Sequence, residues 1–241
     1  MSLGRYLIAG LKVEMEVIGK LLYDRCEKYR NNFDGEPDIT IIPLKENLQR
    51  MHERYPHLSD DAIEYMGTGS MFYYRLLKFG GFMIHSSCIA YDGKAYLFSA
   101  DPGTGKSTHT SLWQENIDGV TVINDDKPAV RWIDDRFYAI GTPWSGKTDQ
   151  NTDIAVPVGG LALLYRGNEN KISKTDAAAI VPFLMRQTAF PSKPENTDRL
   201  VELMDRFIST VPIFRFECDI SEQAVKTSFE AMTGQKYIKR K

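Results

Sequence analysis

The sequence predicts an α/β protein with a mixed sheet, in which an antiparallel hairpin leads into a phosphate-binding loop. Two strand-like runs, FMIHSSCIAY and KAYLFSA, are separated by Asp92-Gly93, a dipeptide that favours a two-residue type I′ turn. The second run leads into residues 100–107, which have the form A-x-x-x-x-G-K-S. A helix-compatible segment at 107–115 and an apolar run at 120–124 follow, as expected for a βαβ unit.

The glycine-rich loop predicts a nucleoside triphosphate with a metal ion. Its glycines let backbone N–H groups close around phosphate oxygens, Lys106 reaches the outer phosphates, and the Ser107 hydroxyl can bind Mg²⁺. Such a string occurs by chance in roughly one chain in fifty of this length. A phosphate-binding role is favoured because an apolar strand precedes the loop, a helix-compatible segment follows it, and two aspartates end the next strand. The predicted nucleotide-binding residues are Gly103, Thr104, Gly105, Lys106, Ser107 and Thr108.

Two adjacent carboxylates follow the next predicted strand. A right-handed crossover makes the strand at 120–124 parallel to 96–99, so Asp125 and Asp126 should leave the sheet at the same edge as the loop. A phosphoryl transfer needs one carboxylate to hold Mg²⁺ and benefits from another that accepts the proton of the attacking hydroxyl. The alternative is an ordinary polar turn before Pro128.

One histidine and one further lysine are expected at the same edge. If Asp92-Gly93 forms the turn, the strand register places His85 opposite Ala100, at the mouth of the loop. A second hairpin, at 129–140, should return Lys147 to this edge, where a cation would stabilise a transferring phosphoryl group. A structural histidine and a surface lysine are the alternatives, and Trp144 can either stack on a ligand or pack.

The first part of the chain predicts a small α+β region over residues 1–79. Apolar residues alternate at 11–17, and 39–42 is a second β-rich run. A helix should begin at Ser59 and end at Gly67 and Gly69. Gly80-Gly81 is the expected boundary with a kinase-like domain over residues 80–241.

The C-terminal third of the sequence is expected to form helices and strands that support the site without taking part in its chemistry. Its apolar patterns indicate strands and helices that alternate after the site, and one helix should restart at an internal proline. These elements are a strand at 160–165, a helix at 176–187 restarted at Pro182, a helix capped near Thr197, a strand at 211–217, and a helix at 221–232 stopped by Gly234.

Composition limits the class of partner. The 241 residues carry a net charge of −2, which gives no basic field for nucleic acid or a membrane surface, and no apolar run is long enough to span a bilayer. Cys26, Cys88 and Cys218 lack metal-site or disulfide-framework spacing, and no secretory signal is recognised, so a cytoplasmic location is expected. Assembly into a homo-oligomer stays open.

Residues 80–147 resemble the phosphoenolpyruvate carboxykinase-like phosphate-loop proteins, especially the HPr kinase/phosphorylase group. The resemblance is carried by His85-Ser86-Ser87, the hairpin, ADPGTGKST and Asn124-Asp125-Asp126. It implies a mixed-sheet core of that type and binding of ATP and Mg²⁺. The roles it implies are Lys106 on phosphates, Ser107 and Asp126 near the metal, Asp125 as base, and His85 beside the reacting phosphates.

Two features depart from the kinase/phosphorylase pattern. Thr108 stands where that group has an acidic residue, and the later arginine-glycine signature is absent. The leading prediction is a kinase that transfers the γ-phosphoryl group of ATP to a hydroxyl, such as a serine of a small protein or peptide, with Asp125, His85, Lys106 and Lys147 as catalytic residues. The alternatives are a small-molecule kinase and a non-catalytic ATP-binding regulator.

Overall fold

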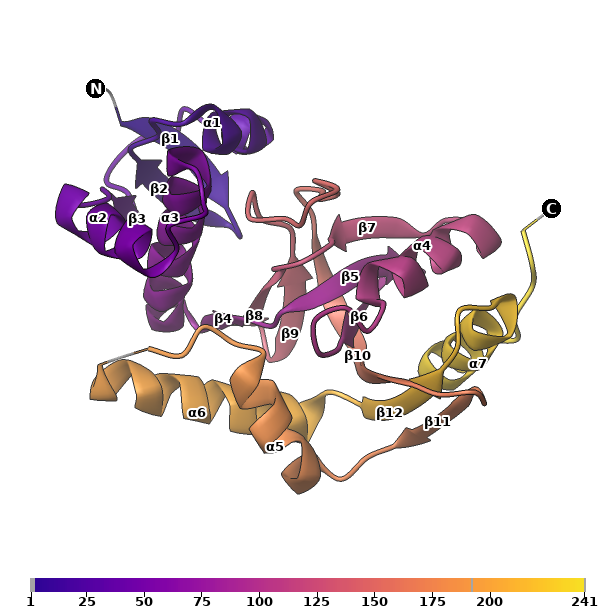
Figure 1. Cartoon of the computed structure of the whole chain (residues 1–241). Coiled ribbons are helices and arrows are strands. Elements are labelled where there is room, and N and C mark those ends of the chain that lie inside the picture. Colours follow the sequence, from indigo (N-terminus) through magenta and orange to yellow (C-terminus); the bar gives the residue numbers. More distant parts are fainter. Residues whose placement is uncertain (1–2, 192, 241) are drawn as a thin grey trace.

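A computed structural model describes residues 3–191 and 193–240. It has a curled mixed sheet with helices on both faces and a small three-stranded sheet near the N-terminus (Figure 1). The strands are β1 (Gly4–Ile8), β2 (Leu11–Met15), β3 (Ile39–Ile41), β4 (Gly81–Met83), β5 (Ser86–Tyr91), β6 (Lys94–Ser99), β7 (Thr121–Asn124), β8 (Ala129–Ile133), β9 (Arg136–Ile140), β10 (Ala155–Arg166), β11 (Lys171–Lys174) and β12 (Ile213–Cys218). The helices are α1 (Lys20–Cys26), η1 (Glu27–Tyr29), α2 (Lys45–Arg54), α3 (Asp60–Leu76), η2 (Leu77–Phe79), α4 (Lys106–Asn116), α5 (Ala177–Arg186), α6 (Pro194–Thr210) and α7 (Glu222–Thr233).

The hairpin β5–β6 forms with the predicted register. Asp92 and Gly93 both have positive φ, 47° and 70°, as a type I′ turn requires, and Tyr91 pairs with Lys94. The ladder continues to the pair Ser86 and Ser99. His85 therefore follows directly at the end of the ladder that leads into the glycine-rich loop.

Strand directions around β6 are mixed. β5 is antiparallel to β6 on one side, and β10 is parallel to it on the other. β7 is antiparallel to β5 and so parallel to β6, as the crossover rule predicts, with β5 between them. The ends of β6 and β7 therefore lie at one edge of the sheet.

The sheet is buried on both faces. α4 and α7 pack on one face, where Trp113 lies beside Phe98 and Phe229, and α5 and α6 cover the other (Figure 1). Burial on both faces explains why these strands are apolar without alternation. The result is a stiff support for the loops at the strand ends.

The sheet curls because β10 is long and pairs with different partners along its length. Its start pairs with β9 and its end with β6 and β12, while β4, at the far end of the strand order, leads directly into β5. The curl returns the segment after β9 to β7, where Thr152 N donates to Ile123 O at 3.0 Å and Asp125 N donates to Gln150 O at 3.0 Å.

Helix α3 corrects a prediction. Gly67 and Gly69 were expected to end it, but the helix runs through both to Leu76. The reason is packing, because a Cβ on Gly69 would lie 2.8 Å from Trp144 Cδ1. Trp144 is buried there, stacks on Phe72, and donates from Nε1 to Thr68 Oγ1 at 3.2 Å, so it serves the core.

The chain changes from helix to strand at the expected boundary. Gly80 ends η2 in the left-handed region, with φ of 68°, and β4 begins at Gly81. One hydrophobic cluster nevertheless continues across this point and joins Tyr73 and Leu76 of α3 to Met83 and Ile140. The division into regions 1–79 and 80–241 stays a prediction.

Two helix details differ from the sequence prediction. α5 is one helix with Pro182 inside it, and α6 begins at Pro194 rather than near Thr197, because proline fits the first turn of a helix. Some elements were not predicted from the sequence. These are α1, η1, α2, η2, β1 and β11.

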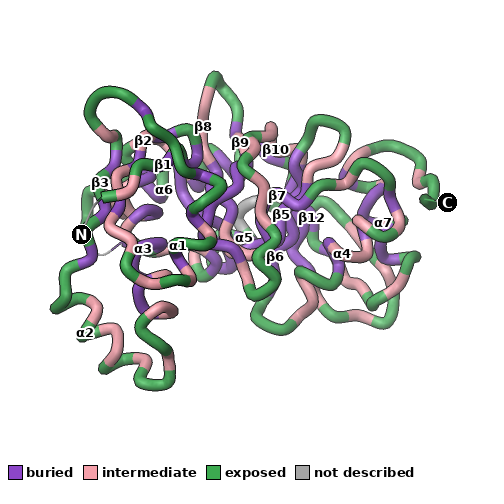
Figure 2. The backbone as a smooth tube through the Cα atoms, turned by 90° about the horizontal axis from the view of Figure 1, so that it is seen from above, coloured by how far each residue is buried: buried purple, intermediate pink, exposed green. Residues whose placement is uncertain are grey.

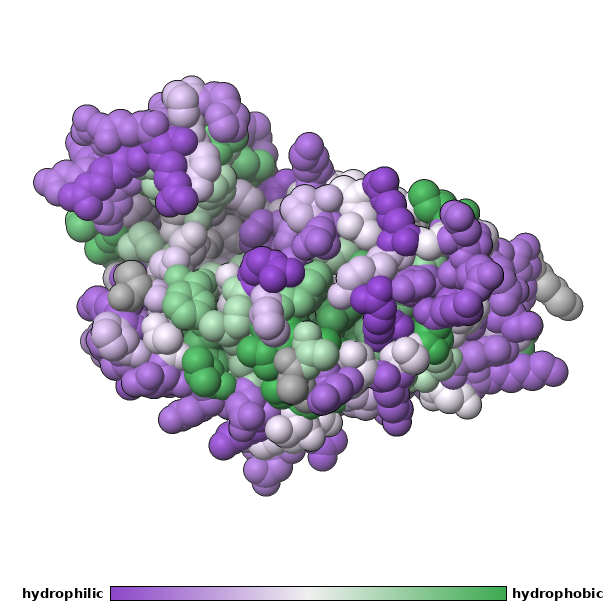
Figure 3. Space-filling view, turned by 60° about the horizontal axis from the view of Figure 1, so that its bottom comes forward, coloured by the Kyte–Doolittle hydropathy of each residue, from purple (hydrophilic) through white to green (hydrophobic). Residues whose placement is uncertain are grey.

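The surface differs between regions. α2 has no buried residue (Figure 2), whereas apolar side chains gather on the face that carries α5 and α6 (Figure 3). Val181 of α5 and Val201 of α6 are 39% and 48% exposed. Within 3–191 and 193–240, none of the helices has the length and apolar character needed to cross a bilayer.

Candidate active site

Four segments meet around one cavity of about 590 Å³ at the edge of the sheet. They are the glycine-rich loop with the start of α4, the end of β7, the residue before β5, and residues 146–148. The cavity is lined by His85, Pro102, Gly103, Gly105, Lys106, Ser107, Thr108, Asp125, Asp126, Gly146, Lys147 and Thr148. The structure thus brings together every predicted site residue except Thr104, which lines a neighbouring cavity.

The loop delivers backbone donors to this cavity. Gly103 and Gly105 have φ of 78° and 119°, backbone that other residues rarely adopt, and Gly105 is the N-cap of α4. No side chain caps this N-terminus. The first N–H groups of α4 and the positive end of its dipole are therefore available to an anion.

Lys106 adds a partly desolvated cation. Its Nζ lies 3.4 Å from Ala100 O, and the side chain is half-buried. Burial lowers the pKa of Lys106, and the nearby Asp126 carboxylate acts in the opposite direction. An incoming anion would therefore interact with a cation that water solvates only in part.

Asp126 is held as an ion by two neighbours. Its Oδ1 lies 2.9 Å from His85 Nε2, and its Oδ2 accepts from the Lys127 ammonium. Burial acts to raise the pKa of Asp126, but the contacts with His85 and Lys127 outweigh it and lower that pKa below the usual range. A carboxylate that is ionised at every physiological pH suits a metal ligand.

His85 is fixed from both sides of its ring. Nδ1 lies 3.1 Å from Gln187 Oε1, opposite the contact of Nε2 with Asp126. The His85 backbone N–H also donates to Gln187 O at 2.6 Å. Gln187, just after α5, is a positioning residue that the sequence did not reveal, because 102 positions separate it from His85.

Asp125 is oriented from the opposite loop. It is 6% exposed, Oδ1 accepts from Gly146 N, and Oδ2 accepts from the Thr148 hydroxyl. Its backbone oxygen accepts from Ser87 Oγ at 2.9 Å. Two donors orient the carboxylate at the cavity wall, and Thr148 is a second site residue that the sequence did not reveal.

Asn124 shapes the turn that separates the two aspartates. Its Oδ1 accepts from Asp126 N at 2.9 Å and Lys127 N at 2.7 Å, and its Nδ2 donates to Thr142 O at 3.1 Å. Bonding to the N–H groups two and three positions on is typical of an asparagine-initiated turn, so this role could have been expected from the sequence. The turn lets consecutive carboxylates meet different partners.

The N-terminal region reaches the site through Arg25. From α1, its guanidinium donates to Tyr65 OH at 2.6 Å, Ser145 O at 2.9 Å and Gly146 O at 2.9 Å. These bonds fix the segment that orients Asp125. Arg25 therefore gives the N-terminal region a positioning role at the site.

The residues present fit a magnesium ion shared with a ligand. In the part of the chain that the structure describes, no three His, Cys, Asp or Glu side chains are placed to hold a metal by themselves. Ser107 and Asp126 line the same cavity and offer oxygen donors. Mg²⁺ is commonly bound in this way, by one or two protein oxygens together with substrate phosphates.

No known family model and no curated protein matches the chain. Among solved structures, the HPr(Ser) kinase/phosphatase from Coxiella burnetii is similar over 63% of this chain and 93% of its own length. The TM-score is 0.33 and the sequence identity is 10%. A likeness this distant carries no argument about function, which must come from the cavity itself.

Proposed function

We propose that this chain is an ATP- and Mg²⁺-dependent phosphotransferase of the HPr kinase-like group that transfers the γ-phosphoryl group to a hydroxyl, such as a serine of a small protein or peptide. One observation carries the proposal. A single cavity is lined by a helix N-terminus behind a glycine-rich loop, by two aspartates, and by His85, Lys106 and Lys147. Phosphoryl transfer depends on such positioning and charge stabilisation more than on covalent chemistry.

In this proposal the loop and Lys106 bind the phosphate chain. The N–H groups at the start of α4 face the cavity, and Lys106 supplies a cation for the outer phosphates. Ser107 and Asp126 would hold Mg²⁺, which neutralises phosphate charge when bound. His85 and Lys147 contact the transferred group and stabilise its charge.

Asp125 takes the proton of the acceptor. The hydroxyl oxygen forms a bond to the γ-phosphorus, the bond from that phosphorus to the bridging oxygen breaks, and ADP keeps the electron pair. The hydroxyl proton passes to the Asp125 carboxylate, which the donors on Gly146 and Thr148 keep oriented. Asp126, whose carboxylate contacts His85 and the Lys127 ammonium, is assigned to the metal instead.

The test compares the two aspartates directly. The protein is incubated with γ-labelled ATP, Mg²⁺ and a serine-containing peptide library, and label on peptide is measured beside ATP affinity. Asp125→Asn should lower the rate of transfer by about 100-fold or more and leave the affinity for ATP unchanged. Asp126→Asn should also lower transfer, but it should raise the Mg²⁺ concentration needed for half-maximal rate.

Asp135→Asn is the matched control. Asp135 is exposed in the turn between β8 and β9 with φ of 60°, which asparagine tolerates, so rate and affinity should stay at wild-type values. A wild-type rate of transfer in Asp125→Asn would exclude Asp125 as the base. Transfer to small alcohols but not to peptides would indicate a small-molecule kinase, and ATP binding with neither transfer nor hydrolysis would indicate a regulator.

A further inference from the structure

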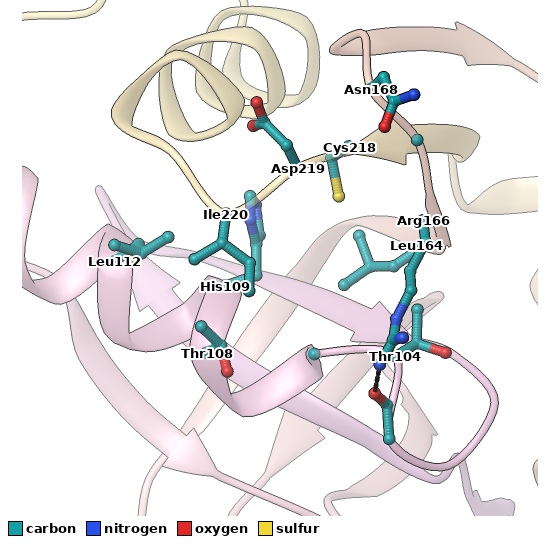
Figure 4. Close-up of a pocket in the computed structure, with 13 residues that line it drawn as sticks. Thr104, Thr108, His109, Leu112, Leu164, Arg166, Asn168, Cys218, Asp219 and Ile220 are labelled. Atoms are coloured by element: carbon teal, nitrogen blue, oxygen red, sulfur yellow. Dashed lines mark hydrogen bonds between the residues drawn. The ribbon is translucent and has the colours of Figure 1, made fainter.

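A second cavity, of about 650 Å³, lies on the other side of the glycine-rich loop (Figure 4). The two cavities share Gly103, Gly105 and Thr108. The walls of the second come from α4, from the end of β10 and from the residues before α7 (Figure 4). A molecule that lies along the loop could therefore occupy both cavities at once.

The second cavity offers apolar walls. Leu112 of α4, Leu164 of β10 and Ile220 line it from three directions (Figure 4). Ile220 is 74% exposed, although nearly all large apolar side chains of the surrounding core are buried. Covering an exposed apolar side chain is favourable, so a ligand with an apolar face would gain free energy by contacting Ile220 together with Leu112 and Leu164.

The ionisable groups around this cavity are neutral or already partnered. Burial lowers the pKa of His109 to about 3, and its Nε2 accepts from Trp113 Nε1 at 3.2 Å. Burial raises the pKa of Cys218 to about 11. The Asp219 carboxylate accepts from Ser221 Oγ and from Asn170 Nδ2.

Arg166 joins this wall to the loop. Its Nη2 donates to Gly103 O at 2.6 Å (Figure 4). The bond orients the carbonyl of Gly103, a residue that lines both cavities. Arg166 is thus a positioning residue between the loop and the apolar walls.

We propose that the second cavity binds the nucleoside half of the donor nucleotide, with the base between Leu112 and Ile220 on one side and Leu164 on the other. This inference rests on the proposed function. If the γ-phosphate faces Asp125 and His85 in the first cavity, the opposite end of the triphosphate leaves the loop on the side of Arg166. The three apolar side chains at that point match the flat faces of a base, and polar groups such as Asn168 stand beside them, a mixture usual for ligand cavities of this size.

Cys218 supplies the reporter for the test. It lines the cavity and is half-exposed, whereas Cys26 and Cys88 are buried. Its alkylation by iodoacetamide at pH 8.5 is followed by mass spectrometry with no ligand, with Mg-ATP, and with Mg-tripolyphosphate. Mg-ATP at ten times its dissociation constant should slow alkylation about tenfold, and tripolyphosphate should leave the rate unchanged.

A pair of variants provides the second measurement. Ile220→Asp should weaken ATP binding about tenfold and leave tripolyphosphate binding unchanged, because an apolar contact with the base is lost. The matched control is Ile238→Asp, since Ile238 is 79% exposed and lies outside the cavity. Its affinity for both ligands should equal that of the wild type.

The outcomes separate the two proposals. If ATP stabilises the protein against heat but neither slows Cys218 alkylation nor depends on Ile220, the nucleoside site is wrong and donor binding stands. Equal protection by ATP and tripolyphosphate would also overturn the nucleoside site, because the phosphates alone would then cause it. If neither ligand binds, both proposals fail.

Discussion

Two segments of this chain match the same phosphate-loop pattern and differ in structure. Residues 100–107 are ADPGTGKS, and residues 141–148 are GTPWSGKT. The first follows β6 and continues into α4, whereas no helix comes directly after the second in the described chain. The Gly105 end of the first is an uncapped helix N-terminus, but in the second the N–H of Gly146 donates to Asp125.

The role of each segment depends on the structure into which it leads. A helix lines up several N–H groups and a dipole behind the first segment, so that segment can bind an anion. The second segment gives its donors to a carboxylate, and its lysine is exposed at the cavity wall. The first segment is suited to bind an anion, and the second orients the Asp125 carboxylate.

The two lysines provide the largest test of this difference. Lys106→Ala should lower transfer by about 1,000-fold and weaken ATP binding, because a half-buried cation behind the phosphates is lost. Lys147→Ala should lower transfer by about tenfold with ATP affinity unchanged, since its side chain is exposed. Transfer rate and ATP affinity are measured for both variants.

Lys94→Ala is the control for this pair, because Lys94 is exposed at the hairpin turn, at the opposite end of β6 from the loop. It should behave as the wild type. Equal losses of ATP affinity in Lys106→Ala and Lys147→Ala would show that both segments bind phosphate. The division of roles inferred from the backbone would then be wrong.

Much of the site could be predicted because its signals are local. Asp92-Gly93 sets the register that places His85 beside the loop, and the crossover rule sends Asp125 and Asp126 to the same edge. Each step uses only neighbouring residues and a topological rule. The mixed sheet and the small N-terminal sheet were predicted in the same way.

The residues that orient the site could not be predicted in this way. Arg25 and Gln187 contact it from 120 and 102 positions away, and nothing in their own neighbourhoods marks them. The sequence indicates a helix end at Gly69 because glycine usually weakens helices, whereas in the structure its lack of a side chain makes room for Trp144. Tertiary packing decided these positions, and a single sequence does not display tertiary packing.

Arg25 tests whether the second segment acts through its geometry. Arg25→Lys should lower kcat by about 30- to 100-fold with ATP affinity unchanged, because one ammonium cannot replace the bonds to Ser145 O and Gly146 O. Arg30→Lys, on an exposed ion pair with Glu27, is the control. Loss of ATP affinity in Arg25→Lys would show that this segment binds nucleotide directly.

The anchorage of α4 behind the first segment should depend on pH through His109. Burial lowers the pKa of His109 to about 3, so below pH 6.5 the unfolded chain takes up a proton that the folded chain excludes. Stability from this group is complete above pH 6.5 and falls as the pH drops, by about 2 kcal/mol at pH 5. Urea unfolding from pH 7 to pH 5 should therefore show a smaller loss for His109→Gln than for the wild type, and parallel curves would contradict the assignment.

The glycines of the two segments give the smallest and most specific contrast. Gly105→Ala should cost about 1 to 2 kcal/mol of folding stability and weaken ATP binding, because its φ of 119° strains any other residue. In Gly146→Ala the new methyl would lie 3.0 Å from Asp125 Oδ2, so transfer should fall while stability and ATP affinity hold. Gly93→Ala, also at positive φ but in the hairpin turn, should lose stability without losing ATP affinity. If Gly105→Ala, like Gly93→Ala, loses stability but keeps its ATP affinity, the first segment does not bind the phosphates.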